Sequence, residues 1–323
     1  MKRVFAVGAS NMDICAKSCD PIREADSNIG IVSNACGGVG RNIAVALKRP
    51  GFGVSFLTAI ADDTFGRDIM SSLKADSVEP VAPLFTGEGL GGELRTGVYS
   101  YILDSNGALL CGINDMRIND ELTPEVFGRY DEVLKAADYV VFEANIPAET
   151  IEYLGSLSKD GVKLAADCVS VSKCRRLSNV LGDLYLLKAN YGEACALAGM
   201  DDASENGGTK DPLAVAQRLA GKGLERGIIT LGKDGAFCFE VHAFEGGGLE
   251  WYRASPPTNA IVNANGCGDV LFAGFLSALS NGRSLKEALE FGQKAASVNA
   301  MSNEAVAKEL SRLDSSLGLE PLA

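Results

Sequence analysis

The chain has 323 residues, of which 46% are hydrophobic and 22% are charged, and its formal net charge at pH 7 is −12. This is the composition of a globular protein long enough to bury a substantial core. The negative charge argues against a nucleic-acid polymer as partner, because phosphate backbones are bound by basic surfaces. No apolar run is long enough to span a bilayer, which argues against a membrane partner.

The cysteines point to a reducing compartment. All nine are scattered along the chain, none forms a Cys-x-x-Cys pair, and no apolar signal segment follows Met1. Zinc ligands come at short, regular spacings, which are absent here. The sequence therefore predicts a cytoplasmic protein with free thiols and no zinc site.

Strand and helix patterns alternate along most of the chain. Short apolar runs predict strands, and apolar residues at helical spacing predict helices. In chain order these are strand 3–9, helix 37–49, strand 54–62, helix 64–75, strand 137–144, helix 148–159, strand 162–168, strand 184–190, helix 191–199, helix 213–223, strand 226–232 and a helix within 263–279. The alternation predicts an α/β fold with a doubly wound, mostly parallel sheet and helices on both faces.

Two segments depart from this alternation. Residues 14–36 are strand-like but interrupted by turn residues, and residues 99–113 form two strand-like runs around Asn106-Gly107, a strong hairpin signal. We expect one small antiparallel sheet, a lid made of about 14–36 and 95–115, inserted in a single domain of residues 1–323. Such a lid could cover a ligand, or pair with a second copy as a homodimer. Residues 201–211 are the best candidate for a flexible loop.

Polar residues follow the first strand and open the first helix. Asn11 and Asp13 come near the carboxyl end of that strand, where open α/β sheets bind ligands. If the chain stays extended, both side chains point the same way and suit sugar hydroxyls, the alternative being an Asx turn. In "GGVGRNIA" (37–44), glycines such as Gly38 let the backbone approach a ligand. Asn42, on an otherwise apolar helix start, serves either a ligand or the helix cap.

Two further motifs lie at strand ends in the second half of the chain. "KANYGEA" places Asn190 at a strand end and Glu193 in the first turn of a helix, and "TLGKDGAF" ends a strand with Thr230, Gly232 and Gly235. Neither motif identifies a chemistry by itself.

The stretch "NANGCGDVLFAGFLSAL" carries the strongest chemical signal. Gly266, Cys267 and Gly268 precede a helix, where small residues let backbone amides converge on an anion. Asp269 then lies beside that anion, where a carboxylate can take a proton from an attacking hydroxyl. The alternative is a glycine turn with an acidic first helical turn. The amides would lower the pKa of the Cys267 thiol and Asp269 would raise it, so this residue is either reactive or a packing residue.

Together and in this order, the motifs resemble the ribokinase-like (PfkB) carbohydrate kinases over nearly the whole chain. The resemblance implies a doubly wound α/β fold with a small β lid. It also implies transfer of the γ-phosphoryl group of ATP, with Mg²⁺, to an alcohol group of a sugar. Asp269 would be the catalytic base. The anion hole would be formed by Gly266, Cys267 and Gly268. The ATP and Mg²⁺ site would be formed by Asn190, Glu193, Thr230, Gly232 and Gly235. The substrate site would be formed by Asn11, Asp13, Gly38 and Asn42. The resemblance assigns no direct protein ligand to the metal.

Within this family the chain resembles the bacterial pseudouridine kinases, through "ADSNIG" (25–30), "GGVGRNIA" and "GINDMRI" (112–118). This similarity implies phosphorylation of the 5′-hydroxyl of pseudouridine. It places four lid residues near the nucleoside: Asp26, Ser27, Asn114 and Asp115. Ser27 and Asn114 would bind it directly. The alternatives are another kinase of the family, acting on ribose, adenosine or a fructose derivative, and a non-catalytic sugar-binding protein on the same scaffold.

Three residues depart from the family pattern. Asn265 stands where the family usually has Thr or Ser, and Cys267 stands where it usually has Ala. Neither change removes the backbone amides of the anion loop. Asn263 stands six residues before Asp269, where many relatives have an acidic residue for a monovalent cation. This departure puts activation by K⁺ in doubt.

Overall fold

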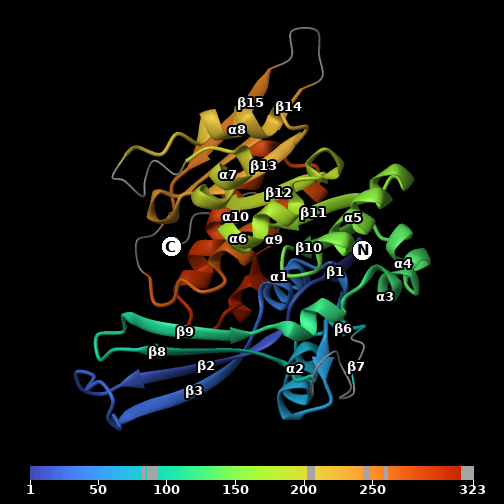
Figure 1. Cartoon of the computed structure of the whole chain (residues 1–323). Coiled ribbons are helices and arrows are strands. Elements are labelled where there is room, and N and C mark those ends of the chain that lie inside the picture. The colour runs from blue at the N-terminus through green and yellow to red at the C-terminus, as the bar shows by residue number, and fades with distance from the viewer. Residues whose placement is uncertain (82–83, 86–93, 202–207, 243–247, 258–260, 314–323) are drawn as a thin grey trace.

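The computed structural model describes residues 1–81, 84–85, 94–201, 208–242, 248–257 and 261–313 (Figure 1). Most of the loop predicted at 201–211 lies outside the described residues.

A nine-stranded sheet forms the centre of the molecule, in the order β15-β14-β13-β12-β11-β10-β1-β4-β6. The strands from β13 to β6 run parallel, and β14 and β15 add an antiparallel edge. The strands are β1 (Arg3–Val7), β4 (Gly53–Leu57), β6 (Glu79–Pro80), β10 (Tyr139–Glu143), β11 (Lys163–Asp167), β12 (Leu186–Asn190), β13 (Arg226–Thr230), β14 (Ala236–Val241) and β15 (Leu249–Ala254). The predicted fold class is confirmed.

Helices cover both faces of this sheet (Figure 1). Along β1, Val4 and Ala6 join one hydrophobic core while Phe5 and Val7 join the other, as the alternation of a strand requires. The first core contains residues of α1 (Val39–Lys48), α2 (Thr64–Ala75), α9 (Cys267–Ser280) and α10 (Leu285–Ala300). The second contains residues of α3 (Pro124–Gly128), α4 (Asp131–Lys135), α5 (Ala148–Ser156), α6 (Val171–Cys174), α7 (Tyr191–Ala198) and α8 (Pro212–Ala220).

Shorter elements join these parts. The 3₁₀ turns are η1 (Arg117–Glu121), η2 (Leu157–Asp160), η3 (Arg175–Leu177), η4 (Leu181–Asp183), η6 (Gly232–Asp234) and η7 (Lys308–Arg312), and β5 (Ile60–Ala61) pairs with β7 (Leu84–Phe85). None of the described helices is long and apolar enough to cross a membrane.

The lid projects from one side of the core as a four-stranded sheet (Figure 1). Its order is β3-β2-β8-β9, with β2 (Asn11–Ser18), β3 (Gly30–Gly37), β8 (Gly97–Leu103) and β9 (Leu109–Asp115). The two outer pairings are antiparallel, as predicted, but the central pair β2–β8 runs parallel. Parallel pairing needs a long connection, and the chain supplies one by returning through the core between these strands.

Several predicted bounds shift. The strand predicted at 54–62 divides into β4 and β5, the helix predicted at 213–223 ends at Ala220, and the first strand ends at Val7. Asn11 and Asp13 therefore begin the lid strand β2 rather than ending a core strand. Helix α10 and the β14–β15 edge were not predicted.

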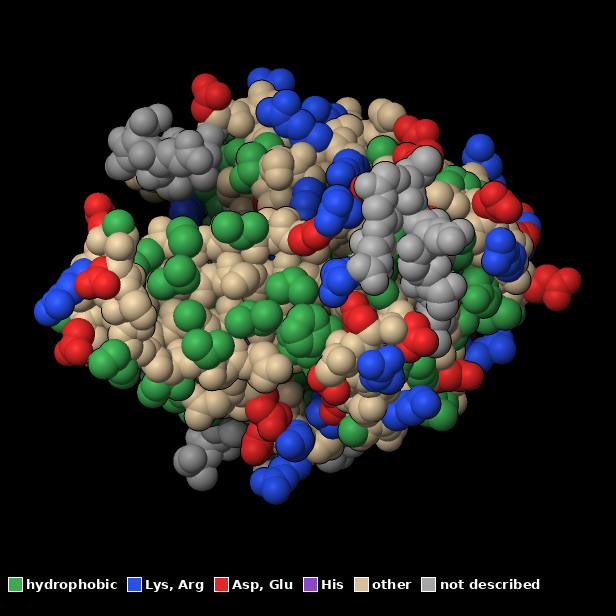
Figure 2. Space-filling model, turned by 60° about the horizontal axis from the view of Figure 1, so that its bottom comes forward, with side chains coloured by type: hydrophobic (Ala, Val, Ile, Leu, Met, Phe, Trp, Pro, Cys, Tyr) green, Lys and Arg blue, Asp and Glu red, His purple; other side chains and the backbone are tan. Residues whose placement is uncertain are grey.

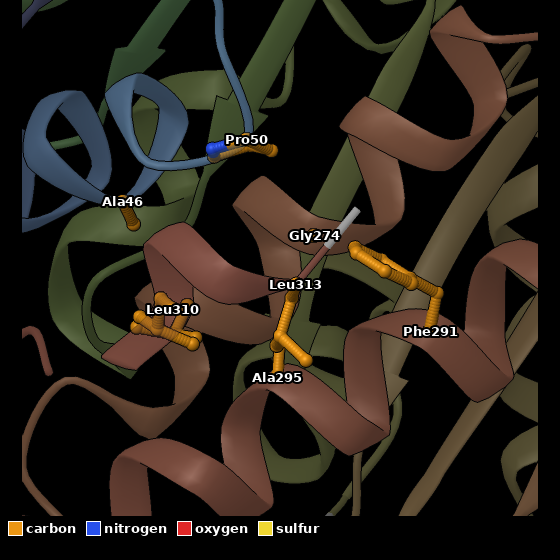
Figure 3. A pocket seen from close by; sticks show the side chains of 8 residues that line it. Ala46, Pro50, Gly274, Phe291, Ala295, Leu310 and Leu313 are labelled. Atoms are coloured by element: carbon orange, nitrogen blue, oxygen red, sulfur yellow. The ribbon is translucent and has the colours of Figure 1, made fainter. Parts of the chain in front are cut away.

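A small void lies where α1, α9, α10 and η7 meet (Figure 3). Its volume is about 10 Å³, close to the minimum for one water molecule. It is lined by Ala46, Pro50, Val270, Gly274, Phe291, Ala295, Leu310 and Leu313. The tight packing of α9 against α10 around it fixes the position of α9, whose first turn carries Asp269.

Candidate active site

Charged and polar residues gather at the carboxyl ends of the parallel strands, the edge where open α/β sheets bind ligands. Glu143, Asp167 and Lys188 are register partners across β10, β11 and β12. Asn190 and Thr230 are partners at the ends of β12 and β13. The sheet thus brings residues from four strands into one row.

The first turn of α9 begins beside this row with its backbone N–H groups not capped by a side chain. Gly266 precedes it with a φ of +74°, and a Cβ there would lie 2.0 Å from the Ala305 carbonyl oxygen. Both facts require glycine. The N–H groups of a helix start lack intrahelical partners. Here the Cys267 N–H donates to the Ala264 carbonyl at 3.3 Å, and the N–H groups of Gly268 and Asp269 can bind an anion.

Asp269 is buried in that turn and is held by Asn42. The Asn42 Nδ2 donates to the Asp269 Oδ2 at 3.0 Å. Gly38 occupies the N-cap of α1, so Asn42 is not the helix cap. Burial, and next the Asp167 carboxylate, raise the pKa of Asp269, while Lys188 and Asn42 oppose the rise. A carboxyl with a raised pKa is a stronger base than an ordinary one.

Lys188 supplies a buried positive charge next to the anion loop. Its Nζ lies 2.8 Å from the Asp167 Oδ2, and a Cβ on Gly268 would lie 3.0 Å from the same Nζ. Burial lowers the pKa of Lys188, but the carboxylates of Asp167, Asp269 and Glu193 outweigh it and raise the pKa above its ordinary value. The amine is therefore charged at neutral pH.

Asn190 and Glu193 are joined in a capping box at the start of α7. The Glu193 side chain accepts from the Asn190 backbone N–H and from its Nδ2, both at 2.7 Å, and the Asn190 Oδ1 accepts from the Glu193 N–H at 2.9 Å. Burial is the main cause of the raised pKa of Glu193. Gly232 and Gly235 form the turn after Thr230, where the Gly235 N–H donates to the Gly232 carbonyl.

Glu143 ties the start of the lid to the core. Its carboxylate accepts the backbone N–H groups of Ala9 at 2.6 Å and of Asn145 at 2.7 Å. Burial raises its pKa to about 7. Sequence reasoning missed Glu143, Asp167 and Lys188. The available signal was a charged residue within or ending a short apolar run, as in "YVVFE", "KLAAD" and "LLKAN".

Three predicted substrate residues share one face of the lid. The Asn11 Nδ2 donates to the Asp13 Oδ1 at 2.6 Å, so both side chains point the same way, as predicted. Asp13 pairs with Tyr99, which pairs with Asn114, and directly paired residues project from the same face. At Gly38 the backbone packs directly against the backbone of Ala9, since a Cβ there would lie 2.4 Å from the Ala9 carbonyl oxygen.

A concavity of about 500 Å³ opens beside Asn114, a size typical of small-molecule sites. It is lined by Asn114, Asp115, Met116, Arg117, Asn119, Asp120, Asn145, Lys173 and Arg176. The Asn119 side chain is buried and its amide makes no hydrogen bond. The Asp115 carboxylate is engaged by Arg117 at 2.6 Å.

Two predicted substrate residues do not lie near the Asn11 and Asp13 side chains. Ser27 and Asp26 lie in the exposed turn between β2 and β3, beyond Ser18. Ser18 lies five positions beyond Asp13 along β2, about 17 Å away at roughly 3.3 Å per residue. Ser27 therefore does not reach the Asn11 and Asp13 side chains within one chain, because the hairpin extends away from them.

Cys267 is half-buried. Its Sγ lies 3.8 Å from the Asn263 carbonyl oxygen. Burial raises the pKa of the thiol, Asn299 opposes the rise and Asp269 adds to it. These surroundings favour packing over reactivity.

Within the described part of the chain, no group of three or more His, Cys, Asp or Glu residues lies close enough to hold a metal ion by itself.

Comparison with known proteins agrees with this arrangement. The profile of the pfkB family of carbohydrate kinases matches residues 1–310. A pseudouridine kinase of Escherichia coli is 29% identical over 295 residues, which cover 91% of this chain and 89% of that protein. A carbohydrate kinase from Agrobacterium tumefaciens superposes with a TM-score of 0.78 at 27% identity, covering 97% of this chain and 96% of the other. A ribokinase from Arabidopsis thaliana, solved with ribose and ATP, has the same fold, with a TM-score of 0.79, 20% identity and coverage of 97% and 98%.

Proposed function

The chain belongs to the pfkB family of carbohydrate kinases, and we propose that it transfers the γ-phosphoryl group of ATP to the 5′-hydroxyl of pseudouridine, giving pseudouridine 5′-phosphate. One observation carries the catalytic part of this proposal. A buried carboxylate, Asp269, is held by Asn42 at the uncapped start of a helix, with the Lys188 ammonium beside the same turn.

The proposed reaction is a direct transfer. Asp269 accepts the proton of the 5′-hydroxyl while that oxygen attacks the γ-phosphorus, and the bond from the γ-phosphorus to the bridging oxygen of ADP breaks. The N–H groups at the start of α9, together with Lys188, stabilise the negative charge on the phosphoryl oxygens. Asn42 keeps the carboxylate aimed at the hydroxyl.

ATP lies, in this proposal, along the ends of β12 and β13, near Asn190, Thr230, Gly232 and Gly235. The donor set fits Mg²⁺ bound indirectly. The carboxylate oxygens of Glu193 are engaged by Asn190, and Asp167 by Lys188, so both would act through water, as Mg²⁺ commonly allows. Bound Mg²⁺ would supply neutralisation of phosphate charge.

The substrate assignment rests on the 29% identical pseudouridine kinase and on the lid. Asn11 and Asp13 suit ribose hydroxyls, and the concavity beside Asn114 offers amide side chains to a base. Pseudouridine presents one more ring N–H than uridine. A site built to hydrogen-bond such a group strongly rejects a substrate that lacks it. Nine free thiols support a location in the reducing cytoplasm.

The test is an ADP-release assay of the purified protein with pseudouridine, uridine, adenosine, ribose and fructose 6-phosphate. Pseudouridine should give the highest kcat/KM. A better substrate elsewhere in the panel would replace the substrate assignment, and binding without ADP release would indicate a non-catalytic sugar-binding protein.

Asp269→Asn is the matched variant for the catalytic step. It should lower kcat by at least about 100-fold, the usual cost of losing a general base, and leave the Kd of ATP nearly unchanged in calorimetry. Near-normal turnover would show that Asp269 is not the base.

A further inference from the structure

The loop that carries the anion-binding amides is supported by a second loop. Gly266 presses against the carbonyl of Ala305, and the backbone N–H groups of Val262 and Asn263 both donate to the Ala300 carbonyl. The segment after α10 therefore packs against and supports the start of α9. The contacts that join these two segments set the direction of the backbone amides in the anion loop.

Asn299 is the side chain that joins them. It is fully buried near the end of α10. Its Nδ2 donates to the carbonyls of Asn265 and Ala305, both at 3.1 Å, and its Oδ1 accepts the Ala307 N–H at 2.8 Å. One neutral amide thus links the anion loop to two residues of its support.

Asn263 adds a second link of the same kind. Its Oδ1 accepts the Asn265 N–H at 2.9 Å, and its Nδ2 donates to the Asn303 carbonyl at 3.3 Å. A cation between these loops would need oxygen ligands free to face it, such as carbonyls or a carboxylate. Here amide N–H donors already engage the carbonyls of Asn265, Asn303 and Ala305, and position 263 is neutral. The donor set does not fit K⁺.

We propose that Asn299 is a positioning residue that holds the anion loop in its working geometry, so that phosphoryl transfer by this protein needs no monovalent cation. The idea rests on the proposed kinase function. Amides that stabilise a transferring phosphoryl group act through preorganisation, and a loop displaced by about 1 Å loses much of their effect. The Asn299 Nδ2 supplies the attraction between carbonyls that a bound cation would otherwise supply.

The first experiment measures kcat and KM in buffers of tetramethylammonium, Na⁺, K⁺ and NH₄⁺ salts at equal ionic strength. The wild-type rates should agree within about 2-fold, as expected where the amide clamp makes a cation unnecessary. A strong K⁺ requirement of the wild type would overturn the proposal.

The decisive variant is Asn299→Asp. It replaces a donor by a carboxylate oxygen facing two carbonyls, which repel it until a cation binds between them. Without K⁺ its kcat should fall about 10-fold or more, with a smaller change in the KM of the nucleoside. Added K⁺ should restore most of that loss and raise Tm. Absence of any K⁺ response in both kcat and Tm would overturn the proposal.

Two further variants separate positioning from stability. Asn299→Ala should also lose kcat, with a weaker response to K⁺, because it leaves no carboxylate. Ser284→Ala removes the N-cap of the same helix at its opposite end, so it should lower Tm and leave kcat unchanged. Equal kcat losses in both alanine variants would reduce Asn299 to a structural role. The K⁺-dependent Tm of Asn299→Asp is measured without substrate, so it still tests the clamp if the substrate assignment fails.

Discussion

The Glu143 carboxyl shows how a single buried residue makes stability depend on pH. Its pKa is raised to about 7 from an ordinary 4.5, so between these values the folded state binds a proton that the unfolded state has lost. The contribution of Glu143 to stability is thus fully present below pH 4.5 and is lost as pH rises through 7.

Glu143→Gln should remove this dependence. The unfolding free energy of the wild type should fall from pH 5 to pH 8 by on the order of 3 kcal/mol more than that of the variant. Urea unfolding at the two pH values measures both differences, and groups shared by the two proteins cancel. Equal slopes for the two proteins would contradict the assignment.

Asn114 tests recognition at the lid. Asn114→Ala should raise the KM of pseudouridine about 2- to 10-fold, the cost of one lost hydrogen bond. It should leave the KM of ATP unchanged, since Asn114 lies on the lid face that carries Asp13, where we propose that the nucleoside binds. Asn106→Ala, in the turn of the same β8–β9 hairpin, is the control. An unaltered pseudouridine KM at saturating ATP would remove Asn114 from the site.

Among the elements, the packing of α9 against α10 places the anion loop. A Cβ on Gly292 would lie 2.8 Å from the Leu271 carbonyl oxygen, and one on Gly274 would lie 3.2 Å from the Ala295 Cβ. The small void beside Gly274 (Figure 3) is not lined by Gly292, where the contact is tighter. Two helices that meet through glycines have little room to adjust, so α9 is held rigidly.

Gly292→Ala should therefore destabilise the protein by about 1–3 kcal/mol, the usual cost of overpacking. Gly128→Ala is the control, because the space around Gly128 in α3 is open and alanine favours a helix by about 0.5–1 kcal/mol. Denaturant midpoints of both variants test this. A Gly292→Ala protein as stable as the control would mean that the helices separate without cost.

At the scale of the whole molecule, the lid carries an exposed apolar surface. Figure 2 shows hydrophobic side chains gathered there with few charged ones among them. Val32, Ile102 and Ile113 project from the face opposite to Asp13 by strand register, and their exposed fractions are 70%, 40% and 74%. Exposed patches of this kind mark interaction sites, and the edge strands β3 and β9 are open to pairing.

We predict that two lids pair in a homodimer. Sedimentation should give a dimer for the wild type and a monomer for Val32→Asp/Ile113→Asp, since burying carboxylates in an apolar interface is costly. Val133→Asp, exposed on α4 away from the lid, should remain dimeric. A monomeric wild type, or a dimer unaffected by the lid substitutions, would refute the pairing. In such a dimer Ser27, at the lid tip, stays a candidate ligand only toward the second copy.

The sequence by itself determined most of the core elements and predicted the anion loop at the start of α9, while it missed α10 and the β14–β15 edge. Apolar runs encode buried parallel strands, and helical spacing encodes α1, α2 and α9, because both signals arise from neighbouring residues. The glycines and Asp269 of the anion loop are likewise consecutive, so their relation to a helix start could be inferred without coordinates.

The tertiary structure decided which distant residues meet. Asn42 and Asp269 are 227 positions apart, and Glu143, Asp167 and Lys188 lie on three strands that become neighbours through sheet order and register. The parallel pairing of β2 with β8, the separation of Ser27 from Asp13 and the contacts of Asn299 likewise depend on where long connections return. Local patterns do not specify such contacts, because they are set by how whole elements pack against one another.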